Sequence, residues 1–205
     1  SAASDVYKRQ ALRVASNDKA ADKGVLVVMN DEIHAAKYVT KTHTTNVATF
    51  QTPTHGPLGI IMKHDILWFK TAEPRVRFDL KQITGTVPII KAYAGMGIGD
   101  GIISLLAPEK IDGVVIEALG AGNLPPLAAR EIKSLMDKGV PVVLVSRCFN
   151  GIAEPVYAYE GGGVKLQEAG VMFIKELNAP KARLKLLIAL SAGLEGQELK
   201  DYIEG

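Results

Sequence analysis

Apolar positions along the chain follow two different spacings. Continuous apolar and β-branched runs, which are typical of strands covered on both faces, occupy residues 25–29, 88–93, 113–117 and 140–146. Apolar residues three and four apart predict helices at residues 99–107, 124–138, 178–190 and 195–203. Because strands and helices alternate after residue 87, we expect a parallel sheet with right-handed crossovers there.

The first third of the chain shows a different pattern. Residues 11–23 predict the end of a surface helix that stops at Gly24. Apolar runs at 58–62 and 66–69 flank a short polar turn and predict a β-hairpin. A strand buried on both faces at residues 25–29 needs neighbours on both sides, yet only one helix precedes it. We therefore expect its sheet to be cut.

Two helices carry N-terminal signals. Asn123 offers an N-cap to the helix at 124–138, and Asn178 or Ala179 offers one to the helix at 178–190. In the second helix, Leu184 and Leu187 share the face that we expect to be buried.

A polar segment divides the chain. Residues 73–86 hold only short apolar pieces and are interpreted as a linker between a first domain at 11–72 and a second at 87–205. Residues 1–10 show neither an apolar region nor a clear period. We interpret them as a non-native leader, with a frayed natural terminus as the alternative.

Composition narrows the classes of function. The chain has 205 residues, of which 47% are hydrophobic and 22% charged, with 24 Lys and Arg against 22 Asp and Glu. This composition argues against disorder, and the interspersed charges give no field of the kind that binds nucleic acid. The longest apolar runs are far shorter than the roughly 20 residues of a membrane span. The single cysteine, Cys148, excludes an internal disulfide.

Most short motifs do not match a known kind of site. The glycine-rich segment at residues 95–101 follows a strand but lacks the spacing of either nucleotide fingerprint. No Gly-x-Ser-x-Gly sequence occurs, and Cys148 has no identifiable base. The histidines stand nine or more residues apart without the spacing of a helical zinc site: His34, His43, His55 and His64.

The segment VTKTHTTNVATF at residues 39–50 is more informative, because five of its twelve residues are threonines and Lys41 lies among them. A partly desolvated lysine can lose its proton near neutral pH and then relay protons from a hydroxyl group. The alternative is a polar segment whose threonines bond to the local backbone, and composition alone favours that alternative.

Several segments resemble bacterial type II L-asparaginases in order and spacing. These are VLVVMND, TKTHTTNVATF and GPLG between residues 24 and 61, followed by GAGNLP, VVLVSRC and LNAPKARLKLL. The resemblance covers the chain from Ala11 to its end. It implies an α/β protein in which the remnant of a larger parallel-sheet N-terminal domain precedes a smaller α/β C-terminal domain with a parallel sheet.

The resemblance also implies a reaction. It implies hydrolysis of L-asparagine to L-aspartate and ammonia without cofactor or metal, with L-glutamine as a possible, weaker substrate. A threonine hydroxyl attacks the amide, an acyl-enzyme forms, and the protein is a homotetramer built as a dimer of dimers. The family's Thr-Gly-Gly-Thr motif does not occur in these 205 residues. We therefore expect the nucleophile to lie upstream of a truncated chain, and the chain alone to be inactive.

Three residues match the family's site. Lys41 falls on the catalytic lysine that handles protons, which reverses the interpretation from composition. Asn123, in GAGNLP, matches an asparagine that reaches the substrate from a partner subunit. Glu160 is our choice for the partner-supplied acid that meets the substrate's ammonium group, and Glu154 is its rival.

Other classes remain open. The fold also serves the asparaginase-like subunit of a tRNA amidotransferase, and a non-catalytic module that binds amino acids or proteins is a further alternative. A type II protein would be periplasmic or secreted, whereas a type I relative would be cytoplasmic, and the chain itself does not decide between them.

Overall fold

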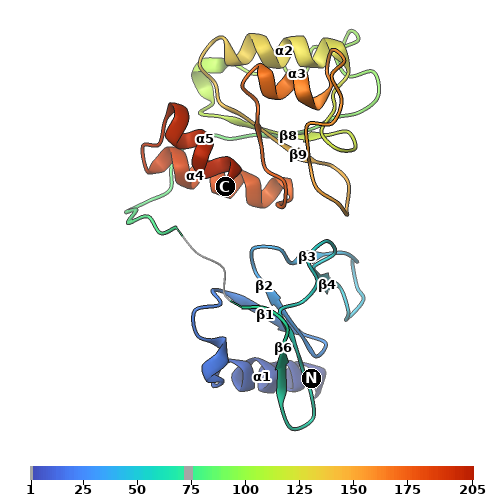
Figure 1. Cartoon of the computed structure of the whole chain (residues 1–205), viewed down its shortest axis with the longest axis vertical. Helices are drawn as coiled ribbons and strands as arrows, with labels where there is room; N and C mark the ends of the chain where they lie inside the picture. Colours follow the sequence, from blue (N-terminus) through green and yellow to red (C-terminus); the bar gives the residue numbers. More distant parts are fainter. Residues whose placement is uncertain (1, 72–75) are drawn as a thin grey trace. The chain divides into compact units, whose positions relative to one another are not determined.

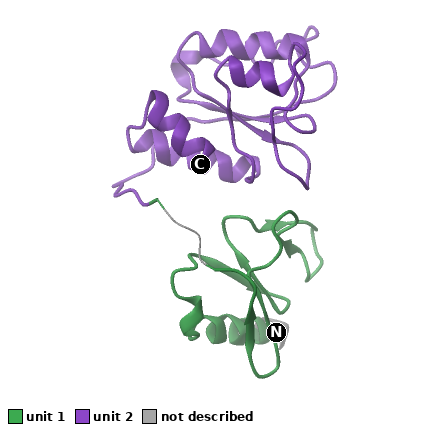
Figure 2. Ribbon diagram, viewed as in Figure 1, with its two compact units in different colours: residues 1–76 green, residues 77–205 purple. Residues whose placement is uncertain are grey.

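A computed structural model describes residues 2–71 and 76–205 and divides the chain into two compact units, Ser1–Val76 and Arg77–Gly205 (Figure 2). The boundary lies within the segment that the sequence predicts as a linker. Residues 76–88 form no helix or strand. The end of this segment is tied to unit 2, where the Thr84 N–H donates to the Ser191 hydroxyl at 3.0 Å.

Unit 1 is an antiparallel sheet covered by one helix (Figure 1). The sheet has the order β1-β2-β5-β6, and all of its pairings are antiparallel. A separate two-stranded ribbon, β3–β4, extends from it. The elements are α1 (Ala2–Ala15), the 3₁₀ turn η1 (Asp18–Ala20), β1 (Leu26–Met29), β2 (Glu32–Ala35), β3 (Thr40–Lys41), β4 (Phe50–Gln51), β5 (Gly59–Ile61) and β6 (Ile66–Trp68).

The first strand differs from the prediction, whereas the hairpin after it agrees. β1 is an antiparallel edge strand whose residues are all partly exposed, not a parallel strand covered on both faces. The reason is local: Asn30 and Asp31 take φ values of 51° and 62°, the two-residue turn that folds a strand directly back on its neighbour. The predicted hairpin is present as β5 and β6, which pair antiparallel.

The helix of unit 1 also ends earlier than predicted. α1 stops at Ala15, and Asn17 caps the following 3₁₀ turn by accepting from the Lys19 N–H. Residues 2–10 are part of α1, so the predicted leader is helical, and its non-native origin stays a prediction. The core beneath α1 is small and consists of Val14, Ile33, Ile61 and Ile66, with partly buried neighbours.

Unit 2 has three layers built on a parallel sheet, as predicted. The sheet order is β10-β9-β8-β7, and all pairings are parallel. Helices α2 and α3 cover one face, and α4 and α5 the other (Figure 1). The elements are β7 (Ile89–Lys91), η2 (Pro108–Lys110), β8 (Val114–Ala118), α2 (Pro126–Met136), β9 (Val142–Ser146), α3 (Gly163–Glu168), β10 (Met172–Phe173), α4 (Ala179–Ser191) and α5 (Gly196–Glu204).

One predicted helix of unit 2 is absent, and the buried face of another differs from the prediction. Residues 99–107 form turns, because glycines with left-handed φ, among them Gly99 and Gly101, interrupt the helical spacing. In α4, Leu187 is buried as predicted, but Leu184 is 49% exposed, and Ala182 and Leu186 complete the buried face. The cap at Asn178 is confirmed, since its side chain accepts from the Lys181 N–H.

Candidate functional site

Lys41 lies on the short ribbon β3–β4, where it pairs with Phe50 and is exposed. The backbone N–H and the hydroxyl of Thr42 both donate to the Thr49 carbonyl, at 2.8 and 2.9 Å. The Thr49 hydroxyl donates to the His43 carbonyl and accepts from the His43 N–H. Thr42 and Thr49 therefore bond to local backbone, and these bonds stabilise the ribbon.

The loop between the two strands is organised by side chains of the same segment. The His43 Nδ1 accepts from the backbone N–H groups of Thr45 and Asn46, at 3.1 and 3.0 Å. The Asn46 Oδ1 in turn accepts from the Ala48 N–H. These bonds fold residues 43–48 into a compact turn beside Lys41.

A polar group that the sequence reasoning missed connects the ribbon to β2. His34 is fully buried, its Nδ1 lies 2.9 Å from the Thr52 Oγ1, and its Nε2 lies 3.4 Å from a Glu32 carboxylate oxygen. Burial lowers the pKa of His34 below its usual value, although Glu32 opposes this shift. The spacing of Glu32 and His34, two residues apart on a strand, was the available signal, because such residues share one face.

In unit 2, Asn123 lies in the turn after β8. The backbone groups of Leu119 and Asn123 bond to each other, and the Asn123 Oδ1 accepts from the Gly163 N–H at 3.2 Å. The N-cap position of α2 is occupied by Pro125, which makes no side-chain cap bond. Asn123 is therefore not the N-cap of α2. It holds the first turn of α3 instead.

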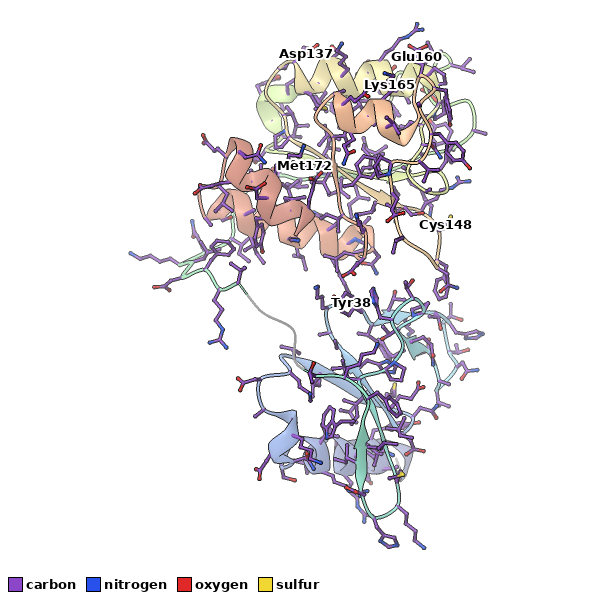
Figure 3. All side chains as sticks on the ribbon, in the orientation of Figure 1. Tyr38, Asp137, Cys148, Glu160, Lys165 and Met172 are labelled. Atoms are coloured by element: carbon purple, nitrogen blue, oxygen red, sulfur yellow. The ribbon has the colours of Figure 1, made fainter. Side chains whose placement is uncertain are left out.

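Glu160 lies just before α3 and is exposed (Figure 3). Its two carboxylate oxygens accept from the Nε and Nη2 of Arg130, at 2.6 and 3.0 Å. These bonds hold the pKa of the Glu160 carboxyl below its usual range. The rival, Glu154, donates its backbone N–H to the Ala121 carbonyl, and its carboxylate lies 3.9 Å from the Lys175 ammonium.

Three consecutive glycines close the loop that carries both glutamates onto the turn at Asn123. The Gly161 carbonyl accepts from the Leu124 N–H at 2.8 Å. A Cβ on Gly161 would collide with the Leu124 carbonyl, and one on Gly162 would collide with the Tyr157 carbonyl. A run of three glycines is a signal for such close backbone approach that can be read from the sequence.

The three predicted site residues lie in different units. Lys41 belongs to unit 1, whereas Asn123 and Glu160 both belong to unit 2.

Cys148 is exposed in the loop after β9 (Figure 3). Within residues 2–71 and 76–205, no three His, Cys, Asp or Glu side chains are arranged to hold a metal ion. In the same residues, no helix is both long and apolar enough to cross a membrane.

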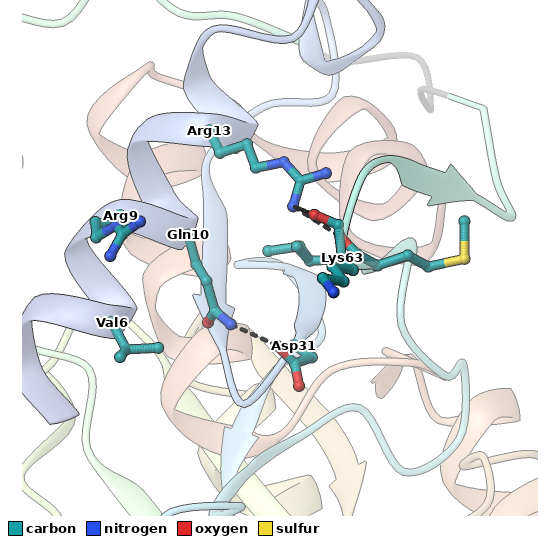
Figure 4. A pocket seen from close by; sticks show the side chains of 8 residues that line it. Val6, Arg9, Gln10, Arg13, Asp31 and Lys63 are labelled. Atoms are coloured by element: carbon teal, nitrogen blue, oxygen red, sulfur yellow. Dashed lines mark hydrogen bonds between the residues drawn. The ribbon is translucent and has the colours of Figure 1, made fainter.

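Two cavities of the described residues lie away from these side chains. One of about 470 Å³ is formed between α1 and the turn after β5 (Figure 4). There, Arg13 donates to the Met62 carbonyl and Gln10 to Asp31. A second, of about 700 Å³, opens at the start of β9 and β10 beside α5. Lys41, Asn123 and Glu160 line neither cavity.

Two family models match the chain and together cover most of it. "Asparaginase, N-terminal" matches residues 8–74, and "Glutaminase/Asparaginase C-terminal domain" matches residues 86–203. The solved structure of a probable cytoplasmic L-asparaginase from Campylobacter jejuni is similar over 95% of this chain and 59% of its own length, with a TM-score of 0.78 and 26% identity.

Curated proteins give the same result. A probable L-asparaginase of Deinococcus radiodurans is 41% identical over 194 residues, which are 93% of this chain and 58% of that protein. L-asparaginase of Bacillus licheniformis is 31% identical, over 92% of this chain and 58% of its own length. The chain thus spans a little over half the length of these relatives. The family models and relatives together show that the chain belongs to the asparaginase/glutaminase family.

Proposed function

We propose that this chain forms part of an L-asparaginase, an enzyme that hydrolyses the side-chain amide of L-asparagine to L-aspartate and ammonia. The observation that carries the proposal is the 41% identity to a probable L-asparaginase over 93% of the chain. Matches to both the N-terminal and the C-terminal family models support it. We expect L-glutamine to be a poorer substrate, and a homotetramer to be the working assembly.

In the proposed mechanism a threonine hydroxyl attacks the amide carbon, and the C–N bond breaks as ammonia leaves with an added proton. Water then hydrolyses the acyl-enzyme, which releases aspartate and restores the hydroxyl. The Thr-Gly-Gly-Thr motif that carries the nucleophile in this family is absent from the 205 residues, so we propose that it is supplied from outside them. Lys41 handles the proton of the attacking hydroxyl.

Asn123 and Glu160 are the proposed substrate-binding residues. The Glu160 carboxylate would meet the α-ammonium group of the substrate, where opposite charges attract. In the structure this carboxylate bonds to Arg130, and both side chains are more than half exposed. Such an exposed ion pair contributes little free energy, so the carboxylate can exchange Arg130 for the substrate's ammonium group. Asn123 already bonds to Gly163 through its side-chain oxygen, which leaves its amide N–H groups to donate to a ligand.

The test compares the chain alone with a completed enzyme. The N-terminal part of the Deinococcus radiodurans relative, which has no counterpart in this chain, is fused in front of residues 11–205. Ammonia release from L-asparagine is then measured. The fusion is expected to be active and the 205-residue chain inactive, because catalytic residues that act as a unit lose nearly all activity together.

Two substitutions in the fusion separate chemistry from folding. Lys41→Ala is expected to lower kcat by at least about 100-fold, the usual contribution of proton transfer. Lys63→Ala, which removes a lysine from the exposed turn after β5, should leave kcat unchanged. A folded fusion without asparaginase activity, or activity of the chain alone that depends on Lys41, would contradict the proposal.

A further inference from the structure

We propose that His34 is a positioning residue for Lys41: its buried ring holds the end of the ribbon β3–β4 against β2 and so fixes where the lysine is presented. The link to catalysis rests on the proposed role of Lys41. The structural part, a ribbon held by one buried histidine, stands on contacts within unit 1 alone.

The ribbon needs such a link because it has little core of its own. It is a separate two-stranded sheet whose strands are two residues long, and residues 41–47 are all exposed. The buried residues flanking it are Val39 before β3 and Thr52 after β4, at 7% and 5% exposure, with Thr49 at 5% at its turn. Thr52 is thus the buried residue at the end of the strand that pairs with Lys41.

Two residues of β2 contact two consecutive residues at this end of the ribbon. The His34 Nδ1 lies 2.9 Å from the Thr52 hydroxyl, and Glu32 accepts from the Gln51 side-chain amide at 3.5 Å. The first contact is short and fully buried, whereas the second is long and partly exposed. Of these two side-chain contacts, the one made by His34 is the stronger.

The chemistry of the neighbours assigns the ring proton. Glu32 offers only acceptors to the Nε2, which lies 3.4 Å away without hydrogen-bond geometry, so we assign the ring proton to the Nε2. In the neutral ring the Nδ1 is then an acceptor, and the Thr52 hydroxyl donates to it. The Thr52 carbonyl meanwhile accepts from the Gly56 N–H at 2.7 Å, which fixes the following turn. The hydroxyl and the carbonyl of Thr52 are thus both bonded, and together they restrict its position.

Variants can separate the two ring nitrogens. In His34→Asn, the side-chain amide lies near the former Nδ1 and can keep the bond to Thr52. In His34→Gln, the amide reaches toward Glu32 and loses Thr52. Thr52→Ser keeps the hydroxyl, and Thr52→Val removes it at equal size. Ile33→Val truncates a fully buried core residue of the same strand and controls for a general loss of stability.

The first measurement is amide hydrogen exchange by NMR on the 205-residue chain. The Thr42 N–H, bonded to Thr49 across the ribbon, reports on the ribbon, and the Phe69 N–H, bonded to Leu58, reports on the sheet. Loss of one buried hydrogen bond should speed Thr42 exchange about five- to tenfold in Thr52→Val and His34→Gln, with Phe69 unchanged. Thr52→Ser and His34→Asn should stay within about twofold of the parent chain.

If Thr42 and Phe69 accelerate together, as expected for Ile33→Val, His34 serves only general stability and the proposal is wrong. It is equally wrong if neither amide responds, or if the conservative variants behave like the disruptive ones. These outcomes do not depend on any enzymatic activity, so they test the ribbon even if the proposed function fails.

The second measurement uses the fused enzyme. Because Lys41 acts in the chemical step, displacing it should lower kcat and leave KM for L-asparagine within about twofold. We expect at least a tenfold lower kcat for Thr52→Val and near-parent values for Thr52→Ser. Altered exchange at Thr42 with unchanged kcat would contradict positioning of the catalytic lysine, whereas an inactive parent fusion would contradict the proposed function instead.

Discussion

Glu160 and Glu154 are the two candidates for the carboxylate that meets the substrate's ammonium group, and their surroundings differ. Glu160 bonds to an exposed arginine, whereas Glu154 faces Lys175 and is tied through its backbone to the turn before Asn123. In the fused enzyme, Glu160→Gln should raise KM for L-asparagine at least about tenfold, since a charge-assisted bond is lost. Steady-state kinetics with Glu154→Gln as the matched variant decides between them, and the reverse order of effects would exchange their roles.

Lys181, in the first turn of α4, gives a prediction about pH. Burial lowers the pKa of its ammonium to about 8 in the folded chain, while the unfolded chain keeps the ordinary value of about 10.4. Between these values the unfolded state binds more protons, so this group makes the folded chain more stable as the pH rises from 8 to 10. Below pH 8 the Lys181 ammonium is charged in both the folded and the unfolded state, so its burial lowers the stability by an amount that no longer changes with pH.

Lys181→Met should therefore stabilise unit 2 at pH 7, and the difference from the parent chain should shrink by pH 10. Guanidinium unfolding at several pH values measures it, because groups shared by both proteins cancel in the difference. Lys138→Met, at an exposed position after α2, controls for an added apolar side chain. A difference that does not change between pH 7 and 10 would contradict the assignment.

At the scale of elements, the sequence predicted the parts of unit 2 whose signal is local. Uninterrupted β-branched runs became β8 and β9, and Asn178 caps α4 as its position suggested. The failures arose where the deciding contact is distant. Asn123 resembles an N-cap, but its oxygen bonds to Gly163, forty residues away. The antiparallel partner of β1 follows from the φ angles of Asn30 and Asp31, which hydrophobic periodicity does not report.

Contacts between residues far apart in the sequence also limit how much of the candidate site can be predicted. Lys41, Asn123 and Glu160 were chosen by resemblance, because nothing in their immediate sequence distinguishes them from surface residues. His34 looks isolated in the sequence, since its partner Thr52 lies eighteen residues further along the chain. Pairings across such distances depend on how the strands fold back, and spacing rules do not contain that information.

The glycine run before α3 allows a matched test of this packing. Gly151 and Gly161 lie in one loop with φ near +90°, but Gly151 faces open space and Gly161 faces the Leu124 carbonyl. Gly151→Ala should cost about 1–2 kcal/mol from backbone strain alone. Gly161→Ala should cost a further ~1–3 kcal/mol because it also overpacks. Urea unfolding of both variants measures the difference, and equal losses would show that the loop yields freely around Leu124.

At the scale of the whole molecule, the two units differ in how much core they contain. The core cluster of unit 1 contains four buried apolar residues, one of them on α1 itself, whereas both faces of the sheet in unit 2 carry extensive apolar clusters. Because buried apolar area is the main stabilising contribution to folding, unit 1 should be the less stable of the two. Each of these cores lies entirely within its own unit, so each unit should unfold as a cooperative body of its own.

Trp68 makes this prediction measurable, because it is the only tryptophan in the chain and it packs against the core of unit 1. Heating should change its fluorescence several degrees below the main loss of circular dichroism at 222 nm, since most helical residues belong to unit 2. Residues 77–205 expressed alone should reproduce the upper transition. Coincident transitions in the whole chain, together with a lower midpoint for residues 77–205 alone, would show instead that the units depend on each other for stability.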